Sequence, residues 1–155
     1  MQILWVHYLG LNLVDSIRNG RTTKWGLEPD KIKAFVLRGT DKHRLLKIAP
    51  DIEIVEGDLN NEIDVKQFLQ NANDAYLFHT AGVIHPKRIR EFYQINRDAT
   101  KTLMKASSMA KIKRAVVVSS NSPCGCNPSI NHTFDESSEY NPYMNYGRSK
   151  MEMEI

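Results

Sequence analysis

Five short apolar runs, separated by amphipathic segments, constrain the fold of this chain more than any other feature. The runs are rich in Val, Ile and Phe, and they cover Ile3–Val6, Ile32–Leu37, Ile52–Val55, Ala75–Phe78 and Ala115–Val118. Near-continuous apolar runs of about 4–6 residues are typical of strands buried on both faces of a parallel sheet. Strands that alternate with helices imply right-handed crossovers. The sequence therefore predicts the α/β class, with an open, doubly wound parallel sheet.

The segments between these runs have helical periodicity. Helices are predicted over Leu9–Ile17, Glu62–Gln70 and Ile89–Met109. In the longest of them, apolar residues recur every three or four positions, as expected of a helix that packs along one stripe. A further helix is predicted to begin near Tyr146. The preceding residues 121–145 contain three prolines, which exclude one long regular element.

Composition limits the function classes. Of 155 residues, 41% are hydrophobic and 25% charged, which are ordinary globular values for a chain of about one domain. The net charge of +3 is small and evenly scattered, so no nucleic-acid or membrane partner is predicted. No apolar stretch approaches the ~20 residues of a membrane-spanning helix, and the first residues lack the pattern of a signal peptide. We therefore expect a soluble, cytoplasmic protein.

The two cysteines predict neither a disulfide framework nor a metal site. They lie one residue apart in Cys124-Gly125-Cys126, with His132 nearby. Two thiols and one imidazole are an incomplete ligand set for zinc, so two free thiols are the expected state and no metal is predicted.

Polar or small residues follow each of the last four predicted strands. Arg38 follows the second strand, Asp58 the third, Ala81 and Gly82 the fourth, and Ser120 the fifth. In an open parallel sheet the ligand lies beyond the carboxyl ends of the strands. We therefore expect these residues to gather at one edge of the sheet.

Tyr146 and Lys150 are candidates for acid–base chemistry. They are four residues apart, so on a helix they share one face. An ammonium beside a phenol favours the phenolate, and a tyrosine placed in this way can exchange a proton with an alcohol or ketone near neutral pH. A serine hydroxyl from the neighbouring strand end can polarise the same oxygen. Taken alone, the spacing also fits an exposed helix pair.

Together these motifs resemble the extended short-chain dehydrogenase/reductase family, the NAD(P)-dependent epimerases, dehydratases and reductases. The matching pieces occur in the family's order from about residue 30 onward: Gly57-Asp58-Leu59, Leu77-Phe78-His79-Thr80-Ala81-Gly82, Asn96-Arg97-Asp98-Ala99-Thr100, Val117-Val118-Ser119-Ser120 and Tyr146-Gly147-Arg148-Ser149-Lys150. The resemblance implies a Rossmann-like fold and hydride transfer at a carbinol or ketone carbon.

The resemblance also assigns catalytic roles. Tyr146 would be the catalytic acid/base, Lys150 would hold the nicotinamide ribose, and Ser120 would be the hydroxyl partner. Ser119, Asn121 and Ser122 lie close enough in register to be alternatives to Ser120. The substrate would be a sugar nucleotide or a small ketone or alcohol. A homodimer would also be compatible with the family.

The remaining roles concern the dinucleotide cofactor. Asp58 and Leu59 would contact the adenine, Ala81 and Gly82 would lie beside the cofactor backbone, and Asn96 would lie near the active site. An arginine after the second strand can pair with the 2′-phosphate of NADP, whereas an acidic residue there binds the ribose of NAD. Arg38 therefore favours NADP over NAD.

The chain departs from the family pattern at both ends. Where a glycine-rich phosphate turn is expected, only Gly10 stands for a glycine, His7 and Tyr8 are bulky, and the segment is about three residues short. At the other end, the later strands and the substrate-binding part are missing from the sequence. We therefore expect residues 1–155 to form one NAD(P)-binding domain that is incomplete at its C-terminus. Two alternatives stay open: a non-catalytic nucleotide-binding or regulatory module, and an inactive fragment.

Overall fold

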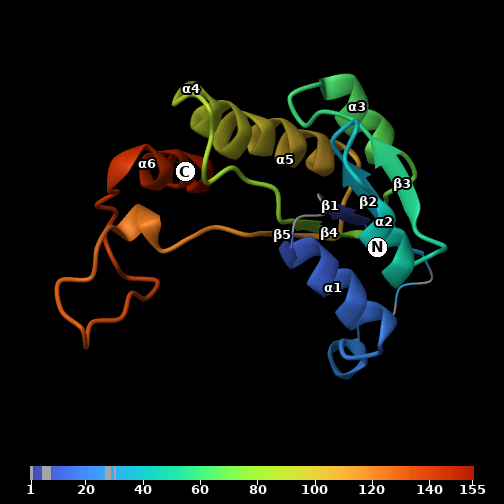
Figure 1. The fold of residues 1–155 in the computed structure, drawn as a ribbon, viewed down its shortest axis with the longest axis horizontal. Helices are drawn as coiled ribbons and strands as arrows, with labels where there is room; N and C mark the ends of the chain where they lie inside the picture. Colours follow the sequence, from blue (N-terminus) through green and yellow to red (C-terminus); the bar gives the residue numbers. More distant parts are fainter. Residues whose placement is uncertain (1, 5–7, 27–28, 30) are drawn as a thin grey trace. The chain divides into compact units, whose positions relative to one another are not determined.

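The computed structural model describes residues 2–4, 8–26, 29 and 31–155, and these contain a five-stranded parallel sheet (Figure 1). Its strands are β1 (Gln2–Leu4), β2 (Lys33–Val36), β3 (Glu53–Glu56), β4 (Tyr76–His79) and β5 (Arg114–Val117). They lie in the order β3-β2-β1-β4-β5, and every neighbouring pair is parallel. The predicted doubly wound sheet is confirmed. Of the predicted first strand, residues 5 and 6 lie outside the described residues.

Helices cover both faces of the sheet. Figure 1 shows α1 (Tyr8–Arg18) and α2 (His43–Ile48) on one side, and α3 (Glu62–Phe68) and α5 (Ala99–Met109) on the other. This distribution follows from right-handed crossovers, because the chain reverses its direction across the sheet between β3 and β4. The sequence did not predict α2, whose buried residue is Leu45. A short 3₁₀ helix, η1 (Thr23–Trp25), follows α1.

Strand β2 has a core on each of its faces. Ala34 and Val36 pack in a cluster with Val14 of α1 and with Leu45 of α2. Phe35 lies on the opposite face, where its ring contacts Phe68 of α3 at a centroid distance of 5.2 Å. The near-continuous apolar run of β2 is therefore explained by burial on both faces.

Strand β5 differs from the prediction that every strand is buried on both faces. Arg114, Ala115 and Val116 are exposed, and only Val117 is half-buried. The reason is position: β5 is one of the two edge strands of the described sheet and pairs with β4 alone, and β3, the other edge strand, likewise has no buried residue. An apolar run of four residues does not distinguish a central strand from an edge strand.

The predicted helix over Ile89–Met109 is helical throughout but not uniform. It consists of α4 (Arg90–Phe92), a π-helical segment η2 (Tyr93–Asp98), and α5. π-Helical turns are rare and occur often at functional sites. This one contains Asn96, whose side chain is fully buried.

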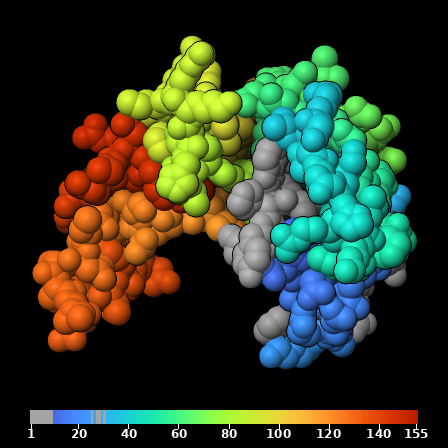
Figure 2. All heavy atoms as spheres, in the orientation of Figure 1, coloured from blue at the N-terminus to red at the C-terminus, as the bar shows by residue number. Residues whose placement is uncertain are grey.

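The chain divides into two compact units. The sheet unit comprises residues 1–81 and 102–118, and the second unit comprises residues 82–101 and 119–155. The second unit holds α4, η2, the 3₁₀ helix η3 (Ser122–Cys124) and α6 (Met144–Glu154). Most of the loop between η3 and α6 is exposed, and it is coloured orange in Figure 2. Within the described part of the chain, no helix is both long enough and apolar enough to cross a bilayer.

Candidate functional site

In the sheet unit, the loops after β2 and β3 form a polar cluster. Arg38 lies in a turn closed by the Thr40 N–H, which donates to the Leu37 carbonyl at 3.0 Å. Gly39 has a φ of +79° at the third position of this turn, as a type II turn requires. Asp58 follows β3 by two residues, and its carboxylate accepts from the backbone N–H of Asn60 at 2.9 Å. Both loops lie at the carboxyl ends of their strands, where the sequence placed them.

Asp64 joins these two loops. Its carboxylate accepts two hydrogen bonds from Arg38, Nη1 to Oδ2 at 2.8 Å and Nη2 to Oδ1 at 2.7 Å. Oδ2 also accepts from the backbone N–H of Asp58 at 2.8 Å. The bond from Arg38, and then the one from Asp58, hold the pKa of Asp64 below its ordinary value. The same ion pair raises the pKa of Arg38.

Gly57 is required at the start of the Asp58 loop because no side chain fits there. A Cβ atom at this position would lie 2.7 Å from Cβ of Asp64 and 2.7 Å from Cζ of Phe35. Leu59, predicted to contact adenine, is buried immediately after this point. Packing of Phe35 and Asp64 against Gly57 therefore fixes where the loop leaves β3.

In the second unit, α6 carries Tyr146 and Lys150 one turn apart. Tyr146 is half-buried, and its ring lies 6.0 Å from that of Phe92 between centroids. Lys150 is only 4% exposed, and burial lowers the pKa of its ammonium. A Cβ atom on Gly82 would lie 3.3 Å from Asn96 Oδ1 and 3.4 Å from Lys150 Nζ, so position 82 lies directly beside both polar groups.

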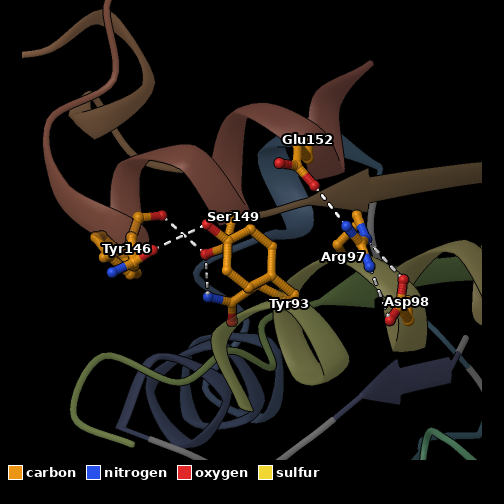
Figure 3. A network of polar contacts seen from close by, with 8 residues as sticks. Tyr93, Arg97, Asp98, Tyr146, Ser149 and Glu152 are labelled. Carbon is orange, nitrogen blue, oxygen red and sulfur yellow. Dashed lines mark hydrogen bonds and ion pairs between the residues drawn. The ribbon is translucent and has the colours of Figure 1, made fainter. Parts of the chain in front are cut away.

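Asn96 connects α6 to the segment after β4. Its Oδ1 accepts from the Val83 N–H at 2.8 Å, and its Nδ2 donates to the Val83 carbonyl at 3.2 Å. Nδ2 also lies 3.0 Å from Ser149 Oγ, to which it donates. Ser149 Oγ in turn donates to the Tyr146 carbonyl at 2.8 Å (Figure 3). A fully buried amide thus fixes the turn of α6 that carries Tyr146.

Two further contacts in Figure 3 hold α6 against η2. Tyr93 donates its phenolic proton to Asn145 at 3.0 Å. Arg97 pairs with Glu152 at 2.6 Å and with Asp98 at 2.7 Å. The hydrogen bond from Arg97 lowers the pKa of Asp98. These pairs restrain both ends of the helix that carries the candidate catalytic residues.

Gly147 brings the start of α6 close to the serine loop. A Cβ atom on Gly147 would lie 2.6 Å from the Ser122 carbonyl oxygen, so only glycine permits this approach. In the same loop the hydroxyl oxygens of Ser120 and Ser122 are 3.0 Å apart. The serine loop thus contacts α6 through the Ser122 carbonyl and through Ser119, whose hydroxyl donates to Glu154, and the choice of Ser120 as hydroxyl partner over Ser119, Asn121 and Ser122 stays a prediction.

The predicted site residues fall into two groups. Arg38, Asp58, Leu59 and Ala81 belong to the sheet unit, as does Gly10, which is buried in the first turn of α1. The second unit brings together Gly82, Asn96 and Lys150, and it also holds Ser120 and Tyr146. His7, at the expected phosphate turn, lies outside the described residues.

Three residues of the site were missed by sequence reasoning: Asp64, Gly147 and Ser149. Asp64 is in the first turn of α3, capped by Asn61, where an acidic residue is also typical of any helix start. Gly147 and Ser149 lie inside the quoted Tyr146–Lys150 motif, and a glycine inside a helix is the usual signal of a close approach.

Two other features do not belong to this site. A cavity of about 390 Å³ is lined by Lys33, Glu53 and Ala75, at the amino ends of the strands, the edge opposite to the ligand edge of such a sheet. Cys124 and Cys126 are free thiols. Across the described ranges, no group of three His, Cys, Asp or Glu residues is placed to hold a metal ion.

The sheet order, with loops after β2, β3 and β4 at the carboxyl ends of the strands, is that of a Rossmann fold. The chain belongs to the NAD dependent epimerase/dehydratase family, whose model matches residues 8–155. The protein y4nL of Sinorhizobium fredii is 45% identical over 124 residues, which cover 80% of this chain and 34% of y4nL. The predicted family resemblance is confirmed.

Solved structures of the same fold come from several bacteria. DesIV, a dTDP-glucose 4,6-dehydratase from Streptomyces venezuelae with NAD and TYD bound, matches with a TM-score of 0.85 at 21% identity, covering 99% of this chain and 49% of DesIV. WbmG of Bordetella bronchiseptica in complex with NAD matches with a TM-score of 0.76 at 21% identity, covering 99% of this chain and 48% of WbmG. The UDP-Glc/GlcNAc 4-epimerase of Campylobacter jejuni matches with a TM-score of 0.75 at 22% identity, covering 99% of this chain and 46% of the epimerase. The chain thus spans about half the length of these structures and about a third of y4nL.

Proposed function

We propose that this chain is the cofactor-binding part of an epimerase/dehydratase-type oxidoreductase, with Tyr146 as its acid/base. The observation that carries the proposal is the arrangement of α6, where half-buried Tyr146 lies one turn before buried Lys150 and the Asn96–Ser149 contacts fix the helix backbone. A buried ammonium with a lowered pKa, one turn from a half-buried phenol, is an arrangement that occurs often at functional sites.

The residues of α6 and its neighbours fit a nicotinamide dinucleotide. Lys150 offers an ammonium for ribose hydroxyls, and Gly82 places no side chain against it. In the sheet unit, Asp58 and Leu59 are the residues expected to contact the adenine. When bound, the cofactor would accept or return hydride at the substrate carbon.

Tyr146 and Ser120 would manage the substrate oxygen. Tyr146 Oη removes the hydroxyl proton as the carbinol becomes a ketone, and returns it when the ketone is reduced. Ser120 Oγ donates a hydrogen bond to the same oxygen, with Ser122 as the alternative donor.

The proposed substrate is a sugar nucleotide. Support comes from the family and from fold relatives such as the dTDP-glucose 4,6-dehydratase and the UDP-Glc/GlcNAc 4-epimerase. NAD is bound in two of the reported fold relatives, whereas Arg38 favours NADP. The proposed cofactor is therefore a nicotinamide dinucleotide, and the choice between NAD and NADP stays a prediction. Small ketones or alcohols as substrates, and a homodimer, stay predictions.

Substitution of Tyr146 tests this proposal. In the full-length protein, supplied with NAD or NADP and a panel of UDP- and dTDP-sugars, Tyr146→Phe should lower kcat about 10²–10⁴-fold with cofactor affinity nearly unchanged. Tyr143→Phe is a matched control, because Tyr143 is 60% exposed and immediately precedes α6. Turnover by Tyr146→Phe at the rate of the control would overturn the assignment.

A non-catalytic nucleotide-binding module is the second candidate function. The specific observation in its favour is the sequence at residues 5–10, which has one glycine where the family has a glycine-rich turn. Such a module would bind the dinucleotide, and the panel above would give no product with any sugar nucleotide.

A further inference from the structure

We propose that Asp64 is a specificity-determining residue that limits the use of Arg38 as a ligand for the 2′-phosphate of NADP. The inference rests on the proposed function, because it concerns the adenosine end of the same cofactor site. An arginine after β2 would by itself favour NADP. Here that arginine already has a carboxylate partner.

The geometry of the pair uses both terminal nitrogens of Arg38. Nη1 and Nη2 each donate to a different oxygen of Asp64, at 2.8 and 2.7 Å. This is the two-pronged arrangement in which a guanidinium also binds a phosphate. A 2′-phosphate would therefore have to share a guanidinium whose charge is already balanced, or displace the carboxylate.

Displacement is unfavourable because Asp64 is buried and Arg38 is not. The Asp64 side chain is 8% exposed, whereas that of Arg38 is 59% exposed. Movement of Arg38 toward a phosphate would leave a buried carboxylate with the Asp58 N–H as its remaining described donor. Removal of one member of a buried charge pair costs more than the pair contributes when intact.

The surrounding charges act in the same direction. Besides Asp64, the carboxylates of Asp58 and Glu56 raise the pKa of Arg38. Lys42 forms an ion pair with Glu56, so both cations of the loop after β2, Arg38 and Lys42, already have carboxylate partners. A phosphate dianion gains little attraction from cations paired in this way, whereas binding of the uncharged ribose hydroxyls of NAD does not depend on such attraction.

Two binding ratios test the inference. Dissociation constants for NADH and NADPH are measured on the full chain by nicotinamide fluorescence, and those for 5′-AMP and 2′-AMP by calorimetry. Asp64→Asn keeps an oxygen that can accept from Asp58 and removes the charge. Asp64→Asn should raise the affinity for NADPH relative to that for NADH about 3–10-fold, and the affinity for 2′-AMP relative to that for 5′-AMP by the same factor. The second variant, Arg38→Met/Asp64→Asn, should return both ratios to within about twofold of the native values.

The outcomes separate this inference from the proposed function. If NADH binds and Asp64→Asn leaves both ratios unchanged, the inference is wrong and the proposed function stands. A tenfold loss of NADPH affinity relative to NADH affinity in the double variant would also overturn the inference, because Arg38 would then bind the phosphate in the native protein. This second comparison holds even if Asp64→Asn alone does not fold. If neither dinucleotide binds the native protein, the proposed function fails and the inference fails with it.

Discussion

Substitution of Gly57 by alanine should destabilise the sheet unit by more than a change of one methyl group suggests. The new Cβ would lie 2.7 Å from Cβ of Asp64, 2.7 Å from Cζ of Phe35 and 2.8 Å from Cε2 of Phe35. Carbon atoms pack at about 3.5–4.0 Å, so each pair must separate by roughly 0.7 Å or more. Because protein interiors resist compression and overpacking typically costs 1–3 kcal/mol, we expect Gly57→Ala to lower the free energy of unfolding by about 2–3 kcal/mol.

Urea denaturation followed by circular dichroism measures this change. The control is Gly26→Ala, because Gly26 has a φ of +70° and, among the described residues, no atom counted as a contact lies within 4 Å of its would-be Cβ. The control introduces only the strain of a Cβ atom in a left-handed backbone conformation, and it should cost about 1 kcal/mol. The displaced Asp58 loop should also weaken NADH binding in Gly57→Ala and not in the control.

A double-mutant cycle with Phe35 tests whether steric exclusion is the reason for the glycine at position 57. Phe35→Leu removes Cε2 and Cζ, so Gly57→Ala should cost less in that background by about 1 kcal/mol. If Gly57→Ala lies within about 0.5 kcal/mol of the native protein, or if the cycle shows no coupling, then steric exclusion is not the reason for glycine at this position.

Two further changes should separate structural from functional roles in the second unit. Asn96→Ala leaves the backbone N–H and C=O of Val83 without their side-chain partner, so it should lower the free energy of unfolding by about 2–3 kcal/mol in urea titrations. The control is Asn131→Ala, because Asn131 is exposed. An equal effect of the two substitutions would contradict the structural role of Asn96. Lys150→Met should raise the free energy of unfolding at neutral pH by about 0.5–2 kcal/mol while weakening NADH binding. Because burial lowers the pKa of Lys150, the folded native protein binds that proton less tightly than the unfolded chain does, and its stability should rise as pH increases through the lowered pKa toward 10.5. Lys150→Met should lack this rise in urea titrations at neutral and alkaline pH, and an unchanged slope would contradict it.

Much of the sheet could be predicted because the interior strand β2 is buried on both faces. The run around β2 alternates between two cores, with Ala34 and Val36 on one and Phe35 on the other, and such a strand has an unmistakable apolar sequence. The run at β5 is just as apolar, yet its side chains are largely exposed. Exposure depends on which strand lies beside it, which local sequence does not encode. Helix α2 was missed because it is one short amphipathic turn with a single buried residue, Leu45.

The site was predicted where a side chain's role follows from its own chemistry. Tyr146 and Lys150 were visible from their spacing, although their catalytic roles stay predictions. Asp64 was not visible, because its importance depends on Arg38, 26 residues away in sequence, and on the burial of its carboxylate. Similarly, Asn96 could be expected near the site, but the π-helical turn that buries it follows from packing and not from periodicity.

Titration of the full chain with NADH tests the central claim most directly, since both catalysis by Tyr146 and discrimination by Asp64 require a bound dinucleotide. The account predicts that nicotinamide fluorescence rises and saturates with a micromolar Kd, and that NAD competes with it. A folded protein whose fluorescence signal shows no saturation up to millimolar NADH would contradict the account.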